Sequence, residues 1–102
     1  MYNVNFKLYI YASNGMLQFE KAMQCAFVPP VNSYIKDKTL LPSLRPPLGS
    51  IKVRNMYIKN LNKGNVTVGL APIGGYHSNR MSELKRLLEE KGWRCIKEKR
   101  EC

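Results

Sequence analysis

The chain is short of acidic residues and contains a single histidine, His77. Of its 102 residues, seven are aspartate or glutamate and 17 are lysine or arginine. General acid–base catalysis needs a histidine or carboxylate held beside the reacting group, and a nucleophile needs a base to activate it. The loops expected below carry no pair of carboxylates. The sequence therefore predicts a protein that is not an enzyme and has no catalytic residues.

Cysteine is scarce as well, with three residues at Cys25, Cys95 and Cys102. Their number is odd, and no Cys-x-x-Cys spacing occurs. A zinc site would need all three together with His77, without the paired spacing that such sites show. No Walker or dinucleotide-binding motif is present. We therefore expect no metal and no cofactor, and reduced thiols in an intracellular protein.

Long hydrophobic runs are missing too. No apolar stretch approaches the roughly 20 residues that a membrane-spanning helix needs. The first residues alternate between apolar and polar and lack the basic start of a signal peptide. These features predict a cytoplasmic protein without a membrane partner.

Positive charge is what the chain has in excess, with a net charge of +10. The region between residues 36 and 63 holds one acid, Asp37, and many of the cations, which are Lys36, Lys38, Arg45, Lys52, Arg54, Lys59 and Lys63. Such a field favours polyanionic partners, which are nucleic acid, an acidic protein surface or anionic lipid. The alternative is that the charge only keeps the protein in solution.

The first 28 residues have the pattern of a β-hairpin. Apolar residues alternate from Tyr2 to Ile10 and again from Leu17 to Phe27, which is the period of a half-buried strand. Asn14-Gly15 between them is a preferred two-residue turn. A turn there pairs Ile10 with Phe19 and puts both apolar stripes on one face of the hairpin.

Residues 29–50 form a loop rich in proline and leucine. Pro29 and Pro30 end the preceding strand, because proline cannot donate to a strand ladder. A short extended piece is expected around Tyr34 and Ile35. Polar linkers lack such leucines, so we expect Leu41 and Leu44 to pack on the sheet or to bind a partner.

A second hairpin is predicted over residues 51–73. Its turn contains Gly64 in the left-handed conformation, which pairs Ile58 with Val68. The alternation slips by one residue between Val53 and Met56, which indicates a β-bulge at Asn55.

The remaining residues predict a helix over 78–91, a short strand over 93–97 and a charged tail. Ser78 and Asn79 are good N-terminal caps, and Gly92 suits the position after the helix. The expected fold is a single α+β domain, residues 1–102. It has an antiparallel sheet of four to five strands, built from the two hairpins, with the C-terminal helix packed on one face and a short last strand.

The bulge has a functional consequence, because it gathers cations and tyrosines on the outer face of the sheet. The second hairpin contributes Lys52, Arg54, Tyr57 and Lys59, and the first contributes Lys7, Tyr9 and Tyr11. Single-stranded nucleic acid is bound by such faces, where cations contact phosphates and aromatic rings stack on bases. The alternative is a solvated face on which tyrosine only suits a strand.

Two segments resemble known families. Phe27-Val28-Pro29-Pro30-Val31 resembles a turn between two hairpins in small uncharacterised proteins of bacteria and their phages, where a glycine follows and this chain has Asn32. That resemblance covers residues 2–73 and implies a fold, not a function. Residues 82–93 are similar to the opening helix and turn of HicA-type mRNA interferase toxins. The Gly-Ser-His that carries the cleaving histidine in that family is missing here.

The favoured function is a non-enzymatic binding protein that engages RNA or DNA through the basic, tyrosine-containing face. The alternative is a protein-binding inhibitor or accessory factor of a phage or mobile element, which would use Leu41 and Leu44. An RNA-cleaving toxin that uses His77 is a third hypothesis. An exposed edge strand would also allow a dimer, and the sequence leaves the oligomeric state open.

Overall fold

The computed structural model describes residues 2–13, 15–35, 51–60 and 64–100. The elements in this part of the chain are β1 (Tyr2–Ala12), β2 (Gly15–Cys25), β3 (Tyr34–Ile35), β4 (Ile51–Asn60), β5 (Asn65–Leu70), β6 (Ile73–Tyr76), a 3₁₀ turn (Ser78–Arg80), α1 (Met81–Glu90) and β7 (Arg94–Arg100). The prediction of an α+β fold with one C-terminal helix is confirmed.

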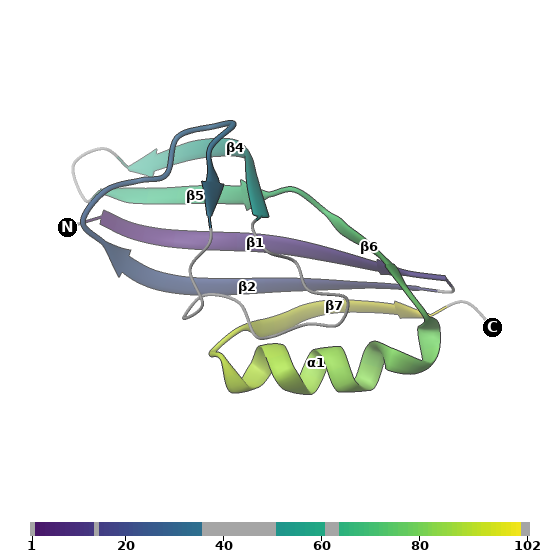
Figure 1. Cartoon of the computed structure of the whole chain (residues 1–102). Coiled ribbons are helices and arrows are strands. Elements are labelled where there is room, and N and C mark those ends of the chain that lie inside the picture. The colour runs from purple at the N-terminus through teal and green to yellow at the C-terminus, as the bar shows by residue number, and fades with distance from the viewer. Residues whose placement is uncertain (1, 14, 36–50, 61–63, 101–102) are drawn as a thin grey trace.

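The strands form one mixed sheet in the order β3-β4-β5-β1-β2-β7, and β6 also pairs with β1 (Figure 1). β1 is antiparallel to β2 but parallel to β5 and β6. The prediction of a purely antiparallel sheet of four to five strands was therefore too simple. Alternating apolar residues occur in both parallel and antiparallel strands, so the pattern alone did not reveal how the two hairpins meet.

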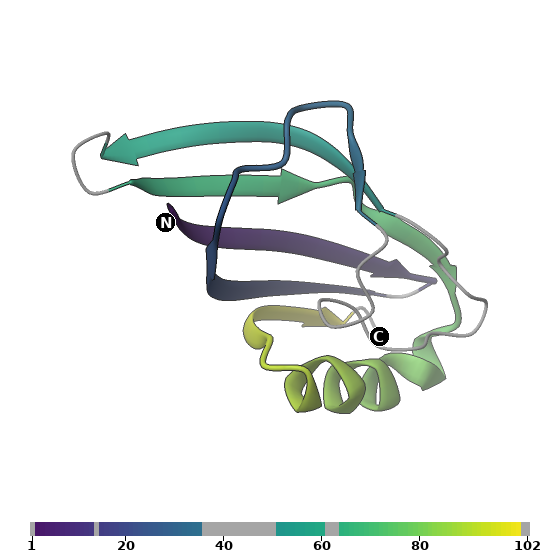
Figure 2. The same cartoon turned by 60° about the vertical axis from the view of Figure 1, so that its left-hand side comes forward.

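The chain reaches the second hairpin by crossing the sheet. Beyond β2, residues 26–33 pass over the face of β1 and β5 and meet β4 (Figure 2). There the amide of Asn32 donates to the carbonyl of Val53 over 2.9 Å, and the amide of Val53 donates to Ser33 over 2.8 Å. Asn32 has a φ of 74°, a conformation that asparagine tolerates better than most residues. Asparagine therefore suits this position of the turn.

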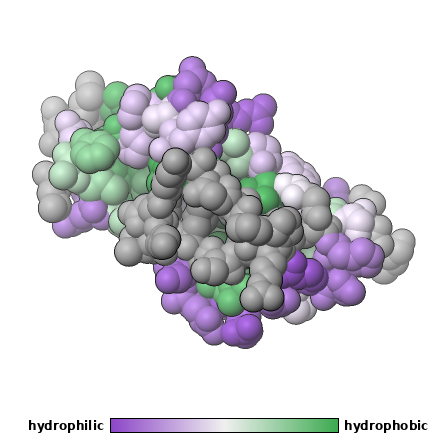
Figure 3. All heavy atoms as spheres, viewed as in Figure 1, coloured by the Kyte–Doolittle hydropathy of each residue, from purple (hydrophilic) through white to green (hydrophobic). Residues whose placement is uncertain are grey.

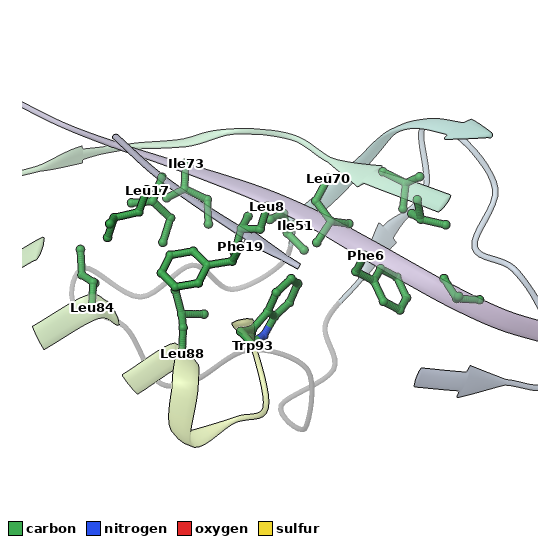
Figure 4. Close-up of a cluster of buried hydrophobic side chains, with 14 of the residues drawn as sticks. Phe6, Leu8, Leu17, Phe19, Ile51, Leu70, Ile73, Leu84, Leu88 and Trp93 are labelled. Carbon is green, nitrogen blue, oxygen red and sulfur yellow. The ribbon is translucent and has the colours of Figure 1, made fainter. Parts of the chain in front are cut away.

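One face of the sheet, the inner face, carries the core. From the strands it buries Val4, Phe6, Leu8, Ile10, Leu17, Phe19, Val53, Val66, Val68 and Leu70. Helix α1 covers the part over β2 and β7 with Met81, Leu84 and Leu88, and Trp93 packs beside them (Figure 4). Burial of each of these large side chains contributes about 1.5–3 kcal/mol to the free energy of folding. Trp93 is 2% exposed and belongs to this core.

Both hairpins are shifted by two residues from the predicted register. Ile10 pairs with Leu17 instead of Phe19, and Ile58 pairs with Val66 instead of Val68. A shift of two keeps every side chain on its face, so the apolar pattern does not distinguish the registers.

Glycine explains the register of the first hairpin. Gly15 is the first residue of β2, opposite Ala12, and the turn lies one residue earlier than predicted. A Cβ at Gly15 would collide with the carbonyl oxygen of Lys99 in β7 and would lie 3.0 Å from the side chain of Met81. The site suits glycine because a strand and the start of the helix pack closely there.

The ends of α1 differ in how well they were predicted. Gly92 has a φ of 89° and its amide donates to Glu89 over 3.0 Å, as expected after a helix. At the other end, Arg80 is the N-cap and makes no side-chain cap hydrogen bond. The expected caps Ser78 and Asn79 instead lie in the 3₁₀ turn.

Lys21 occupies an apolar position of β2, opposite Phe6. Its Nζ donates to the carbonyl of Lys91 at the C-terminal end of α1. Helix C-termini attract cations, because their last carbonyls lack partners within the helix. The lysine that interrupts the apolar stripe therefore ties the helix end to the sheet.

The charged tail predicted after residue 97 is wrong for the residues that the structure describes. β7 continues to Arg100 and pairs with β2. The register shifts between the pairs Gln18–Lys97 and Phe19–Cys95. That irregularity breaks the alternation in the sequence, which is why the strand was expected to end early.

We predict that Gly15→Ala destabilises the fold by about 1–3 kcal/mol, because the added methyl overpacks the contact with Lys99 and Met81. Gly74→Ala is the matched control, since a Cβ there meets no atom within 4 Å. Both changes remove the same backbone freedom from the unfolded chain. Denaturant unfolding followed by circular dichroism measures the difference. Equal unfolding midpoints would contradict the described contact.

Candidate functional site

The outer face of the sheet, opposite α1, carries five of the predicted site residues around one hollow. In β1, Lys7, Tyr9 and Tyr11 alternate with buried Leu8 and Ile10. The hollow has a volume of about 360 Å³. Its lining, which we call the tyrosine hollow, consists of Lys7, Tyr9, Tyr11, Arg54, Asn55, Tyr57, Gly69, Leu70 and Pro72.

The irregularity in β4 builds this hollow. Val53 pairs with Leu70 and Asn55 pairs with Gly69, so Arg54 is the extra residue. The bulge predicted at Asn55 thus occurs one residue earlier. It returns Met56 to the inner face opposite Val68, while Tyr57 lies opposite Thr67 on the outer face.

Gly69 provides the floor of the hollow. It has no side chain to fill the space between β1 and β4, and the amide of Asn55 lies directly over it. A Cβ at Gly69 would collide with the Oδ1 of Asn55. The pair of Asn55 and Gly69 therefore fixes both the path of β4 and the shape of the outer face.

The other predicted site residues are less informative. Lys52 is exposed on β4, opposite Tyr34 of β3, and does not line the hollow. Lys59 belongs to β4, but its side chain is not among those described. Leu41 and Leu44, proposed for partner binding, lie outside the described residues.

Charge is divided between the two faces of the sheet. Of the carboxylates in the described part of the chain, Glu20 is the one on the outer face. Its Oε1 lies 3.7 Å from the Nζ of Lys7, and its Oε2 lies 3.6 Å from a guanidinium nitrogen of Arg94. Glu98 faces inward opposite Leu17 and pairs with Lys85 of α1 over 3.8 Å.

Three cations of β7 extend the outer face and were missed by the sequence prediction. Arg94, Lys97 and Lys99 lie opposite Glu20, Gln18 and Met16, all outward-facing positions of β2. All three cations are exposed. Arg94 and Lys97 are three residues apart, so simple alternation places them on opposite faces. The register shift near Cys95 brings them to the same face.

A second hollow lies further along β1 on the same outer face. It has a volume of about 360 Å³ and is lined by Asn3, Val4, Asn5, Ala22, Met23, Gln24, Asn65, Val66 and Thr67. Because its side-chain polar groups are mostly amides, we call it the amide hollow. The Nδ2 of Asn3 donates to the Oδ1 of Asn65 over 3.2 Å.

Exposed apolar side chains gather on the inner face, at the end of the sheet away from the start of α1. Phe27, Ile58 and Met56 are 71%, 52% and 38% exposed. They line a hollow of about 350 Å³ together with Tyr2 and Val66. Figure 3 shows the hydrophobic patch at the left-hand end of the molecule.

In the part of the chain that the structure describes, the groups considered for chemistry lie outside the two outer hollows. His77 is exposed and lines neither outer hollow. Cys25 and Cys95 are not joined in a disulfide. In the described ranges, no three histidine, cysteine or acidic side chains are grouped as a metal ion would require. No helix in those ranges is long and apolar enough to span a bilayer.

Comparison with known proteins adds no functional information. The chain has no significant match to a protein-family model, to a curated protein or to a solved structure. The chemistry of the outer face is therefore the basis for inferring a function.

We predict that Cys95 reacts slowly with alkylating reagents. Burial raises the pKa of its thiol above the ordinary value of 9.0, although Lys85 acts in the opposite direction. In a Cys25→Ser/Cys102→Ser background, iodoacetamide should therefore modify the folded protein more slowly than the urea-unfolded protein at about pH 8, since the thiolate is the reactive form.

The same shift makes stability depend on pH. Because the pKa of Cys95 is higher in the folded state, its protonated thiol contributes to the free energy of unfolding. This contribution is fully present below the unfolded pKa and is lost as the pH rises through the folded pKa.

In the alkylation experiment, equal rates in the folded and unfolded states would contradict the burial of Cys95.

Proposed function

We propose that this chain is a small binding protein that holds nucleic acid on the outer face of its sheet. The observation that carries the proposal is the tyrosine hollow, where Lys7 and Arg54 surround the same space as Tyr9, Tyr11 and Tyr57. Cations contact phosphates, and exposed aromatic rings stack on unpaired bases. This combination suits a single strand better than a duplex, whose bases are already stacked.

The charge around the hollow supports the same proposal. Arg94, Lys97 and Lys99 add positive charge at the β7 side of the face, within a chain of net charge +10. Such a field attracts polyanions over a distance and speeds their encounter. Glu20 partly offsets Lys7 and Arg94, since its carboxylate lies between them.

Binding to labelled single-stranded oligonucleotides of mixed sequence, measured by fluorescence anisotropy, tests the proposal. The logarithm of the binding constant should fall linearly with the logarithm of salt concentration, with a slope of about −0.7 for each phosphate contact. Arg54→Ala should reduce the magnitude of that slope by about 0.7, the value for one phosphate contact. Tyr57→Ala should weaken binding by about 1–3 kcal/mol through lost stacking, and Tyr57→Phe should retain most of the affinity.

Arg86→Ala is the matched control for charge. It removes one cation from the exposed side of α1, where Arg86 pairs with Glu90 over 2.8 Å, and should change affinity little. The proposal fails if no oligonucleotide binds at low salt. It also fails if Arg86→Ala and Arg54→Ala weaken binding equally, because the outer face would then have no special role.

A protein partner is the second candidate function, and the exposed apolar patch around Phe27 and Ile58 favours it. Charge-poor, apolar surfaces of this kind are common at protein interfaces. In that case a Phe27→Ser/Ile58→Ser variant would lose a protein partner while its oligonucleotide affinity stayed the same. The contrary result, loss of oligonucleotide binding in this variant, would implicate the inner face in nucleic-acid binding.

A further inference from the structure

The amide hollow has a different chemistry from its neighbour. No lining residue is charged, and the polar side chains are Asn3, Asn5, Gln24, Asn65 and Thr67. Each amide presents both a donor and an acceptor. The hydrogen bond from Asn3 to Asn65 links two of these amides across β1 and β5.

A small residue keeps the hollow open. Ala22 lies opposite Asn5 in the β1–β2 ladder, and it is exposed on the outer face. Its outward-facing neighbours on β2, Glu20 and Gln24, have much longer side chains. A long side chain at position 22 would occupy the space that the amides surround.

We infer that the amide hollow is a subsite that reads an unpaired base, preferentially adenine, of the strand bound on the outer face. This inference rests on the function proposed above. Asparagine and glutamine form paired hydrogen bonds to the N6 donor and N7 acceptor of adenine, whereas guanine favours arginine or lysine and cytosine favours a carboxylate. The neutral lining of the hollow matches adenine among these.

The two outer hollows are close enough to share one strand of nucleic acid. Tyr9 and Asn5 are four residues apart in β1, which is about 14 Å at the rise of a β-strand. That distance is about four nucleotides at the 3.4 Å spacing of a stacked strand, and fewer if the strand is stretched. A base can thus enter the amide hollow while another stacks on a tyrosine.

The test compares labelled DNA oligonucleotides of adenine, cytosine or thymine, each about eight nucleotides long so that they exceed the estimated span. We expect the adenine oligonucleotide to bind about tenfold more tightly than the cytosine one, which corresponds to one paired contact. Ala22→Leu should abolish this preference by filling the hollow, and Ala22→Ser should retain it. Asn3→Ala/Gln24→Ala should also remove it, with the space left open.

The outcomes separate the inference from the proposed function. Salt-dependent binding that weakens in Tyr57→Ala, but shows no base preference, would overturn the amide subsite and leave the proposed function standing. An adenine preference that survives Ala22→Leu but is lost in Tyr57→Ala would assign the preference to stacking and would also overturn the inference. Absence of binding to every oligonucleotide would overturn both. Thermal unfolding of each variant confirms that the fold is intact.

Discussion

The extra residue in β4 determines which side chains the sheet presents to solvent. Arg54 has no partner in the β4–β5 ladder, and Asn55 meets Gly69 instead. Without this shift, the strand after Val53 would turn Met56 and Ile58 outward and Tyr57 inward. Gly69 permits the arrangement, because the amide of Asn55 occupies the place of a side chain. The tyrosine hollow exists as a result of this local contact.

The same sheet separates apolar, acidic and basic groups. Core residues and α1 lie on the inner face, and the carboxylates of Glu83, Glu89, Glu90 and Glu98 lie on the helix or face inward from β7. The outer face keeps lysines, arginines, tyrosines and amides, with Glu20 between two cations. A surface ion pair of this kind contributes little to stability. Its main effect is to lower the positive charge at one point of a face that otherwise favours a polyanion.

Alternation in the sequence predicted the faces of the strands in the two hairpins, but not which strands are neighbours in the sheet. The slip between Val53 and Met56 predicted the bulge, and with it the grouping of Lys7, Tyr9, Tyr11, Arg54 and Tyr57. The register errors of two residues arose because a shift by two leaves every side chain on its face. The parallel pairing of β1 with β5 depends on the crossing of residues 26–33, which carries no periodic signal. The amide hollow was missed because its amides meet only through the parallel pairing of β1 with β5, which places Asn3 beside Asn65. Lys97 and Lys99 were missed because the irregularity near Cys95 interrupts the alternation in β7.

The claim that the outer face binds nucleic acid is tested most directly by two-dimensional NMR of the ¹⁵N-labelled protein during titration with a short single-stranded oligonucleotide. The account predicts that amide shifts change along β1, around Lys7 and Tyr9, and at Tyr57 and Gly69, while the exposed residues of α1 and the apolar patch at Phe27 are unaffected. Shift changes confined to α1 or to the Phe27 patch, with β1 unperturbed, would contradict it.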